Sequence, residues 1–289
     1  MVTKKQHVRQ DGNALKVTNW MSHDGSSKAW ADEEGRQPEY VAKGINDRPT
    51  IRFNGSSHVL KTDCAPPAGN LERTIMVVVA NTQLETANQS NNNHIVHYGN
   101  SKQDEAYGIV LSRQKAGAKI GNHYWNNTFY GLFSMDKDLH IITASYDGAA
   151  DLFHVDGQFT GKNFVTLNTS AQHPLTLGGR VGGTQELYGG DLAEVLVFDK
   201  ALSASDRQQI ENFFAKRYDK PLQLAHTNFN LSAGGEVLML SNKQGEVLHR
   251  LDLPPLPTDV SYCLDGQVEG HFSTPTPGGA NGQPELSLL

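Results

Sequence analysis

The sequence lacks the features that mark membrane, zinc or nucleic-acid-binding proteins. Its longest apolar run, residues 75–80, is far shorter than the roughly 20 residues that cross a bilayer as a helix, so no membrane insertion is expected. Neither Cys64 nor Cys263 belongs to a Cys-x-x-Cys pair, which excludes the usual zinc and redox spacings and leaves two free thiols or one disulfide. Acidic and basic residues alternate without blocks, at a net charge of −6, so no nucleic-acid partner is expected.

Short strand-like runs fill most of the chain. The 28 glycines and 12 prolines among 289 residues are typical of a soluble, turn-rich protein. Residues 73–80 are apolar at successive positions, which predicts a strand buried on both faces. Two Asp-Gly turns, at Asp147 and Asp156, predict a meander of antiparallel strands. The pattern therefore predicts an all-β domain.

One stretch, residues 189–218, predicts a strand followed by a helix that closes this domain. Ser203 is the expected N-cap, because its hydroxyl can accept a backbone N–H of the first turn. Ile210, Phe213 and Phe214 recur at helical spacing, so they are expected to form a stripe that packs on the strands.

Several motifs in order resemble the laminin-G-like, concanavalin A-like jelly-roll family, which is found in many bacterial surface proteins. The resemblance covers about residues 17–218, and the segments that carry it are 48–55, 145–148, 154–157, 177–179 and 190–218. It implies a concanavalin A-like antiparallel β-sandwich with one C-terminal helix, a domain over residues 1–221 whose first 16 residues are extended or disordered, and a secreted or cell-surface location. No signal peptide is recognised at residues 1–10.

A second resemblance, to part of a lamin-tail domain, follows the first. It is carried by residues 229–240, 242–250, 260–262 and 274–281, and the front strands of that family are missing. Residues 222–289 are therefore expected to form a small β extension. Because so short a piece rarely supports its own core, it is expected to pack on the jelly roll or to complete its sheet from elsewhere.

The resemblance leaves enzyme and binding module open, because the jelly-roll family contains both. The laminarinase-type hydrolases of this family carry Glu-x-Asp-x-x-Glu on one strand, and this sequence contains no Glu-x-Asp. His94 and His97 stand three apart, which on one strand places them on opposite faces and makes a poor metal site. A non-catalytic module is therefore favoured.

The best candidate for ligand contact is the stretch from Gly121 to Tyr130. Sugars stack on aromatic faces while amide and imidazole groups fix their hydroxyls, and this stretch supplies both kinds of side chain. The predicted ligand-binding residues are Asn122, His123, Tyr124, Trp125, Asn126 and Tyr130. The alternative is a loop whose aromatic residues pack on the edge of the sandwich.

Calcium is a candidate cofactor, because laminin-G-like domains often bind it through loop carboxylates. Asp147, Asp151 and Asp156 lie at neighbouring hairpin ends and could supply oxygen ligands, although Asp-Gly is also an ordinary turn sequence. The function predicted is extracellular recognition of carbohydrate, or of a cell-surface or matrix protein. A polysaccharide-degrading hydrolase or lyase and a structural adhesion or spacer module are the alternatives, and the oligomeric state is left open.

Overall fold

The structure, a computed structural model, divides into two compact units. One consists of Met1–Leu202 with Arg207–Leu224, and the other of Ser203–Asp206 with Ala225–Leu289. The boundary expected after residue 221 stays a prediction. The residues that the structure describes are 8–83, 92–112, 118–182, 186–222, 232, 234–242, 244–255, 261–265 and 268–272.

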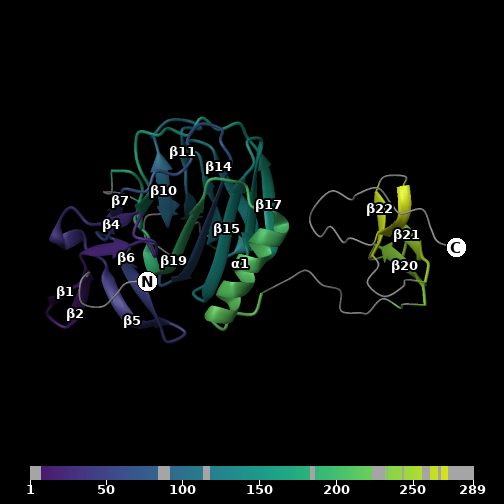
Figure 1. The fold of residues 1–289 in the computed structure, drawn as a ribbon, viewed down its shortest axis with the longest axis horizontal. Coiled ribbons are helices and arrows are strands. Elements are labelled where there is room, and N and C mark those ends of the chain that lie inside the picture. The colour runs from purple at the N-terminus through teal and green to yellow at the C-terminus, as the bar shows by residue number, and fades with distance from the viewer. Residues whose placement is uncertain are drawn as a thin grey trace. The chain divides into compact units, whose positions relative to one another are not determined.

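A nine-stranded antiparallel sheet forms one layer of the large unit (Figure 1). Its order is β1-β2-β5-β6-β19-β8-β15-β16-β17. The strand of this sheet that comes last in the sequence, β19, lies in its middle, between β6 and β8. The strands are β1 Val8–Asp11, β2 Ala14–Val17, β5 Glu39–Ile45, β6 Arg48–Asn54, β8 Arg73–Asn81, β15 Leu139–Tyr146, β16 Ala150–Val155, β17 Gln158–Phe164 and β19 Gly189–Phe198.

Two smaller antiparallel sheets form the second layer. One has the order β11-β10-β18-β7-β4-β3 and the other β14-β13-β12-β9. Their strands, with one 3₁₀ turn η1 before β5, are β3 Asn19–Met21, β4 Lys28–Trp30, η1 Glu34–Arg36, β7 Leu60–Thr62, β9 Asn92–His94, β10 Val96–Gly99, β11 Ala106–Tyr107, β12 Ile109–Ser112, β13 Lys119–His123, β14 Thr128–Ser134 and β18 Thr176–Leu177.

The strand β8 is buried on both faces, as its continuous apolar run predicts. Ile75, Val77 and Val79 point into the main core between the two layers. Val78 points the other way, because side chains alternate along a strand, and packs in a second cluster with Phe214 of the helix. The all-β sandwich with one helix is therefore confirmed.

The helix α1 (Ala204–Arg217) covers the outer face of the nine-stranded sheet (Figure 1). Ser203 caps it as predicted, because its Oγ accepts the backbone N–H of Asp206 at 3.1 Å. The expected apolar stripe needs correction: Phe214 is buried, but Phe213 is 58% exposed.

The buried face of α1 is partly charged. Four buried residues recur at spacings of three or four, which places them on one side of the helix. They are Arg207, Glu211, Phe214 and, just after the helix, Tyr218. Glu211 tolerates burial because it pairs with Arg207 and accepts a hydrogen bond from Thr143 Oγ1 at 2.8 Å. This ion pair occupies the face that the sequence assigned to apolar residues alone.

The small unit contains two β-hairpins. They are β20 Glu236–Ser241 with β21 Val247–Leu253, and β22 Ser261–Asp265 with β23 Val268–Phe272. The first hairpin exposes apolar side chains such as Met239 and Leu248. Much of the lamin-tail resemblance, including residues 229–231 and 274–281, lies outside the described residues.

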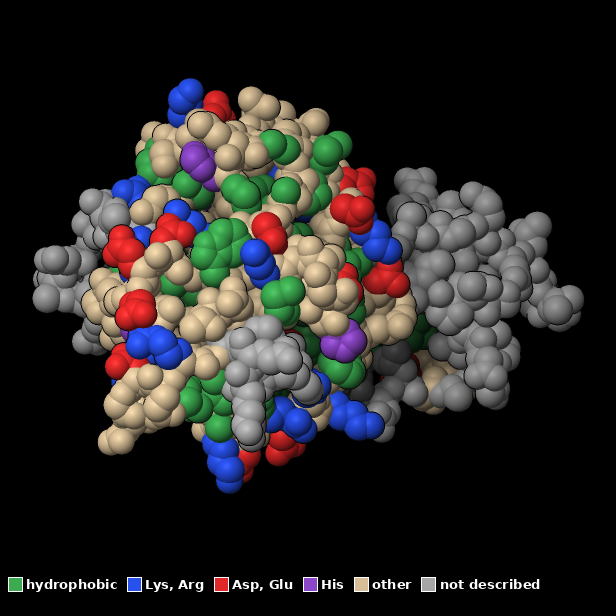
Figure 2. All heavy atoms as spheres, turned by 60° about the vertical axis from the view of Figure 1, so that its left-hand side comes forward, with side chains coloured by type: hydrophobic (Ala, Val, Ile, Leu, Met, Phe, Trp, Pro, Cys, Tyr) green, Lys and Arg blue, Asp and Glu red, His purple; other side chains and the backbone are tan. Residues whose placement is uncertain are grey.

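The surface of the large unit carries charges of both signs. On the face in Figure 2, acidic, basic and hydrophobic side chains are interspersed among other side chains and backbone. Within the described part of the chain, no helix combines the length and the apolar character needed to cross a membrane.

Candidate functional site

The predicted ligand loop is a tight hairpin between β13 and β14. The backbone N–H of Tyr124 donates to the carbonyl of Asn127 at 2.9 Å, and the two residues between them, Trp125 and Asn126, have φ values of 67° and 56°. Positive φ at both central positions is the pattern of a type I′ turn, which fits the twist of a hairpin. A bulky residue rarely adopts this conformation, so Trp125 occupies a strained position at the tip.

Two of the predicted contact residues face the core instead of solvent, which corrects the prediction for them. Asn122 and Tyr124 are completely buried and donate to Asp151 Oδ2 at 2.9 and 2.6 Å. Tyr107 donates to Asp151 Oδ1 at 2.7 Å. Because alternate residues share one face of a strand, Asn122 and Tyr124 point toward Asp151 while His123 points to the opposite face of β13.

The ring of His123 lies against two further histidines, His94 and His97. Ring centroids are 4.6 Å apart for His94 and His97, 5.1 Å for His94 and His123, and 6.1 Å for His97 and His123. The sequence expectation that His94 and His97 point to opposite faces is wrong. The backbone bends at Ile95, so β9 and β10 are separate strands that belong to different sheets.

All three imidazoles are buried and neutral. Burial is the main cause that holds the pKa of His94 and His97 well below the ordinary value and lowers the pKa of His123 to about 4. Among the residues that the structure describes, neither ring nitrogen of His94 has a hydrogen-bond partner, and neither do the Nε2 atoms of His97 and His123. Buried imidazole nitrogens are normally hydrogen-bonded, so this cluster can offer donors and acceptors to a ligand or to bound water.

Trp125, Arg180 and Glu186 border the histidine cluster. The Arg180 guanidinium carbon lies 5.2 Å from the centre of the Trp125 ring, and Arg180 Nε lies 3.6 Å from Glu186 Oε2. Glu186 Oε2 is also 3.3 Å from His94 Nε2. Like Trp125, Glu186 has a left-handed backbone, with φ of 55°, and such residues concentrate at functional sites.

The last two predicted contact residues lie beside this group. Asn126 is exposed at the tip of the turn, whereas Tyr130 is half-buried on β14 and donates its hydroxyl to Asn92 Oδ1. Of the six residues predicted, Trp125, Asn126 and Tyr130 are therefore at least partly exposed, whereas His123 is buried against the Trp125 ring. His94, Arg180 and Glu186 join them from distant parts of the sequence.

The three predicted calcium ligands lie in three separate environments. Asp147 caps its own turn by accepting the N–H of Ala150, and Asp151 is enclosed in the core. Asp156 accepts from the backbone N–H of Ile141. Among the described residues, no group of three or more His, Cys, Asp or Glu side chains is arranged to hold a metal ion.

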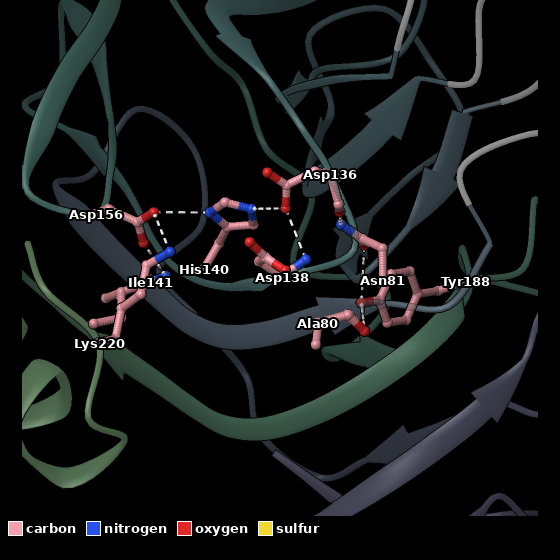
Figure 3. Close-up of polar contacts among 9 residues, drawn as sticks. All are labelled: Ala80, Asn81, Asp136, Asp138, His140, Ile141, Asp156, Tyr188 and Lys220. Carbon is pink, nitrogen blue, oxygen red and sulfur yellow. Dashed lines mark hydrogen bonds and ion pairs between the residues drawn. The ribbon is translucent and has the colours of Figure 1, made fainter. Parts of the chain in front are cut away.

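Figure 3 shows what Asp156 does instead. Its Oδ2 lies 2.8 Å from His140 Nδ1 and 3.1 Å from Lys220 Nζ, and His140 Nε2 reaches Asp136 Oδ1 at 3.0 Å. This network has His140 and Asp156 buried at its centre and joins β15 and the end of β16 to the chain beyond α1. Calcium stays a prediction, which titration with calcium followed by thermal melting can test.

A groove of about 860 Å³ opens where β19 leaves β6. Residues Gly189–Leu192 of β19 pair with β6, whereas Glu194–Phe198 pair with β8 alone. Leu177, Val195 and Phe213 are among its lining residues, and so is Cys64, which forms no disulfide within the described part of the chain. The side chain of Cys263 lies outside the described residues, so the predicted alternative of a disulfide stays open.

Neither a protein-family model nor a curated protein matches the chain. Solved structures do. A GH54 α-L-arabinofuranosidase soaked with a cyclic sulfate inhibitor is similar with a TM-score of 0.56 and 10% identity, over 91% of this chain and 61% of that chain. An arabinofuranosidase complexed with arabinofuranosyl-α-1,2-xylobiose has a TM-score of 0.52 and 12% identity, over 92% and 62%. The binding domain of Paraclostridial Mosquitocidal Protein 1 has a TM-score of 0.50 and 12% identity, over 90% and 70%.

At such identities these similarities show the fold alone. They agree with the sandwich architecture described above. This chain spans about 61% of the first arabinofuranosidase and 62% of the second.

Proposed function

We propose that the large unit is a non-catalytic carbohydrate-binding module, secreted or at the cell surface, which binds glycan beside Trp125. The observation that carries this proposal is a half-buried tryptophan with a left-handed backbone at the tip of a hairpin, whose ring lies against His123. Ring nitrogens of His94, His97 and His123 have no hydrogen-bond partner among the described residues. An aromatic ring can stack on the apolar face of a sugar while imidazole, amide and guanidinium groups bind its hydroxyls.

The arrangement of carboxylates favours binding over hydrolysis. Glycoside hydrolases need two carboxyl groups, one on each side of the scissile bond. Among the described residues, Glu186 is the one carboxylate in contact with the histidine cluster. The buried Asp151 faces the opposite side of β13 and is satisfied by three donors.

A polysaccharide-cleaving enzyme is the second candidate. The observation that favours it is the closeness of Glu186 to His94. Burial raises the pKa of the Glu186 carboxyl and lowers the pKa of the His94 imidazole, so the two values approach each other. Such a pair can exchange a proton, as general acid–base catalysis requires. Reducing-sugar and unsaturated-product assays on a polysaccharide panel test it. Turnover that is lost in Glu186→Gln would establish the enzyme and overturn the binding-module proposal.

A glycan array with the full chain tests the leading proposal, and the Trp125→Ala variant locates the site. We expect retention of some glycans by the native protein and loss of that retention in Trp125→Ala. Phe164→Ala is the matched control, because Phe164 is an exposed aromatic residue with a cation over its ring on another strand, β17. Retention unchanged in Trp125→Ala, or lost equally in both variants, would contradict the proposed site.

A further inference from the structure

We propose that the groove beside β19 binds an extended segment of another polypeptide chain, rich in consecutive apolar residues, which pairs with the free edge of β19 as an added strand. This inference goes beyond the proposed glycan site. Among the described residues, the lining of the groove includes neither Trp125 nor a member of the histidine cluster.

The sequence explains why β6 stops pairing with β19. The last pair joins Ile51 to Leu192, and the register then shifts at Ala193, as it does at a β-bulge. A bulge bends its strand and disrupts the ladder locally. Two residues before Ile51, Pro49 has no N–H to donate. The ladder between β6 and β19 therefore ends here, although β19 continues.

The remaining part of β19, Glu194–Phe198, has one free edge. Its residues pair with β8 from Val78 to Thr74, and no described strand pairs with them on the other side. In an antiparallel ladder, alternate backbone N–H and C=O groups point to opposite sides. These residues are partly buried, and backbone groups that lose water without gaining a partner cost free energy. The edge is therefore a template for one more strand.

The walls of the groove come from both sides of the sheet. Leu177 belongs to the second layer, and Phe213 belongs to α1 on the outer face. The side chains of β19 follow the same division, because Val195 packs against the main core and Leu196 against the cluster beneath the helix. A segment that pairs with β19 would extend the sheet between these two walls.

The two walls determine which side chains such a segment needs. Met21, Leu175 and Leu177 line one wall, and Ile210 and Phe213 line the other. Successive side chains of a strand point to opposite faces, so those of an added strand would meet the two walls in turn. Apolar residues at consecutive positions are therefore favoured, as in a strand that is buried on both faces.

The charges along the groove are balanced. Asp24 and Glu194 are the acidic side chains among the described lining residues, and Lys28 and Arg217 are the basic ones. Glu194 and Arg217 also pair with each other at 3.1 Å. The groove therefore offers no net charge to attract an acidic or a basic segment, which again favours an uncharged apolar one.

The size of the free edge fits a peptide better than a second copy of the chain. Its five residues span about 17 Å, at a rise of about 3.4 Å per residue. In a stable dimer each partner buries about 800 Å², which is much more than one short edge offers. Strand addition by an extended peptide uses edges of this kind and gains affinity from main-chain hydrogen bonds.

Synthetic peptides test the inference on the full chain by fluorescence anisotropy. The probe is a labelled peptide of five consecutive valine and isoleucine residues between two lysines. In a second peptide each apolar residue is N-methylated, which removes the backbone donors and keeps the side chains. In a third, serine replaces alternate apolar residues. We expect the first peptide to bind at least about 10-fold more tightly than the other two, because each of them lacks one of the two kinds of contact.

Variants of the protein locate the binding. Phe213→Ala should weaken binding of the first peptide about 10-fold, because this exposed ring forms part of one wall. Phe164→Ala is the matched control, because Phe164 is also an exposed phenylalanine but is not among the described lining residues. Trp125→Ala should bind the peptide as the native chain does.

Each other outcome would overturn the inference. These outcomes are no binding of the first peptide, equal binding of its N-methylated form, and equal weakening in Phe213→Ala and Phe164→Ala. Sedimentation of the protein alone gives a further check. Dimerisation that Phe213→Ala abolishes would identify a second copy as the occupant, against the inference. None of these results alters the test of glycan binding at Trp125.

Discussion

Asp151 should impose an unusual pH dependence on the stability of the large unit. It is completely enclosed and accepts hydrogen bonds from Tyr107, Asn122 and Tyr124. Burial is the main cause that raises its pKa from the ordinary 3.8 to about 6, although the three donors and nearby Arg73 oppose that shift. A shift of about two units corresponds to about 3 kcal/mol between the two protonation states.

The sign follows from proton binding. Because the pKa of Asp151 is higher in the folded than in the unfolded chain, the folded state binds more protons between about pH 4 and pH 6. The stability that Asp151 contributes is therefore fully present below the unfolded pKa and is lost as the pH rises through about 6. Asp151→Asn cannot titrate, so subtracting its free energy of unfolding from that of the native chain isolates this effect from all other groups.

The measurement is urea unfolding followed by tryptophan fluorescence, since Trp20, Trp30 and Trp125 all lie in the large unit. From pH 4 to pH 7, the native protein should lose about 2.4 kcal/mol of unfolding free energy relative to Asp151→Asn. A difference that stays constant within about 1 kcal/mol, or that changes in the opposite direction, would refute the argument from burial.

Two further predictions concern the framework around the site. Gly178→Ala should destabilise the large unit by more than about 2 kcal/mol, because φ of Gly178 is 78° and an added Cβ would collide with the Phe53 ring. Gly182→Ala is the control, because Gly182 is also left-handed but an added Cβ there would meet nothing within 4 Å. In the same urea titration this control should cost only about 1 kcal/mol. Asp156→Asn should lower the melting temperature clearly more than Asp147→Asn, because Asp156 is buried between His140 and Lys220 whereas Asp147 caps an exposed turn; equal effects would contradict the role of the network in Figure 3.

The sequence predicted correctly those strands, turns and caps that depend on residues close together in the chain. The continuous apolar run of β8, the Asp-Gly turn at Asp156 and the Ser203 cap each depend on residues close in sequence, and the structure confirms all three. Phe213 was misplaced because the helix buries a hydrogen-bonded ion pair, and apolar periodicity cannot reveal such a pair.

The candidate site was predictable only in part. The aromatic and amide residues around Trp125 drew attention because they are adjacent, but strand alternation turns Asn122 and Tyr124 inward. Arg180 and Glu186 join the site through long-range packing, which no local signal encodes. The pair His94 and His97 was visible in the sequence, yet its geometry depends on the bend at Ile95.

The central position of β19 has a consequence for how the protein is made. Synthesis runs from the N-terminus, so β19 is the last strand of this sheet to be made. The strands on its two sides, β1-β2-β5-β6 and β8-β15-β16-β17, are therefore complete before the strand that joins them exists. The two halves of the sheet can meet only after residue 198 has left the ribosome. Such late, non-local pairing makes folding slow, because the loop-closure entropy is lost before the central contacts of the sheet can form.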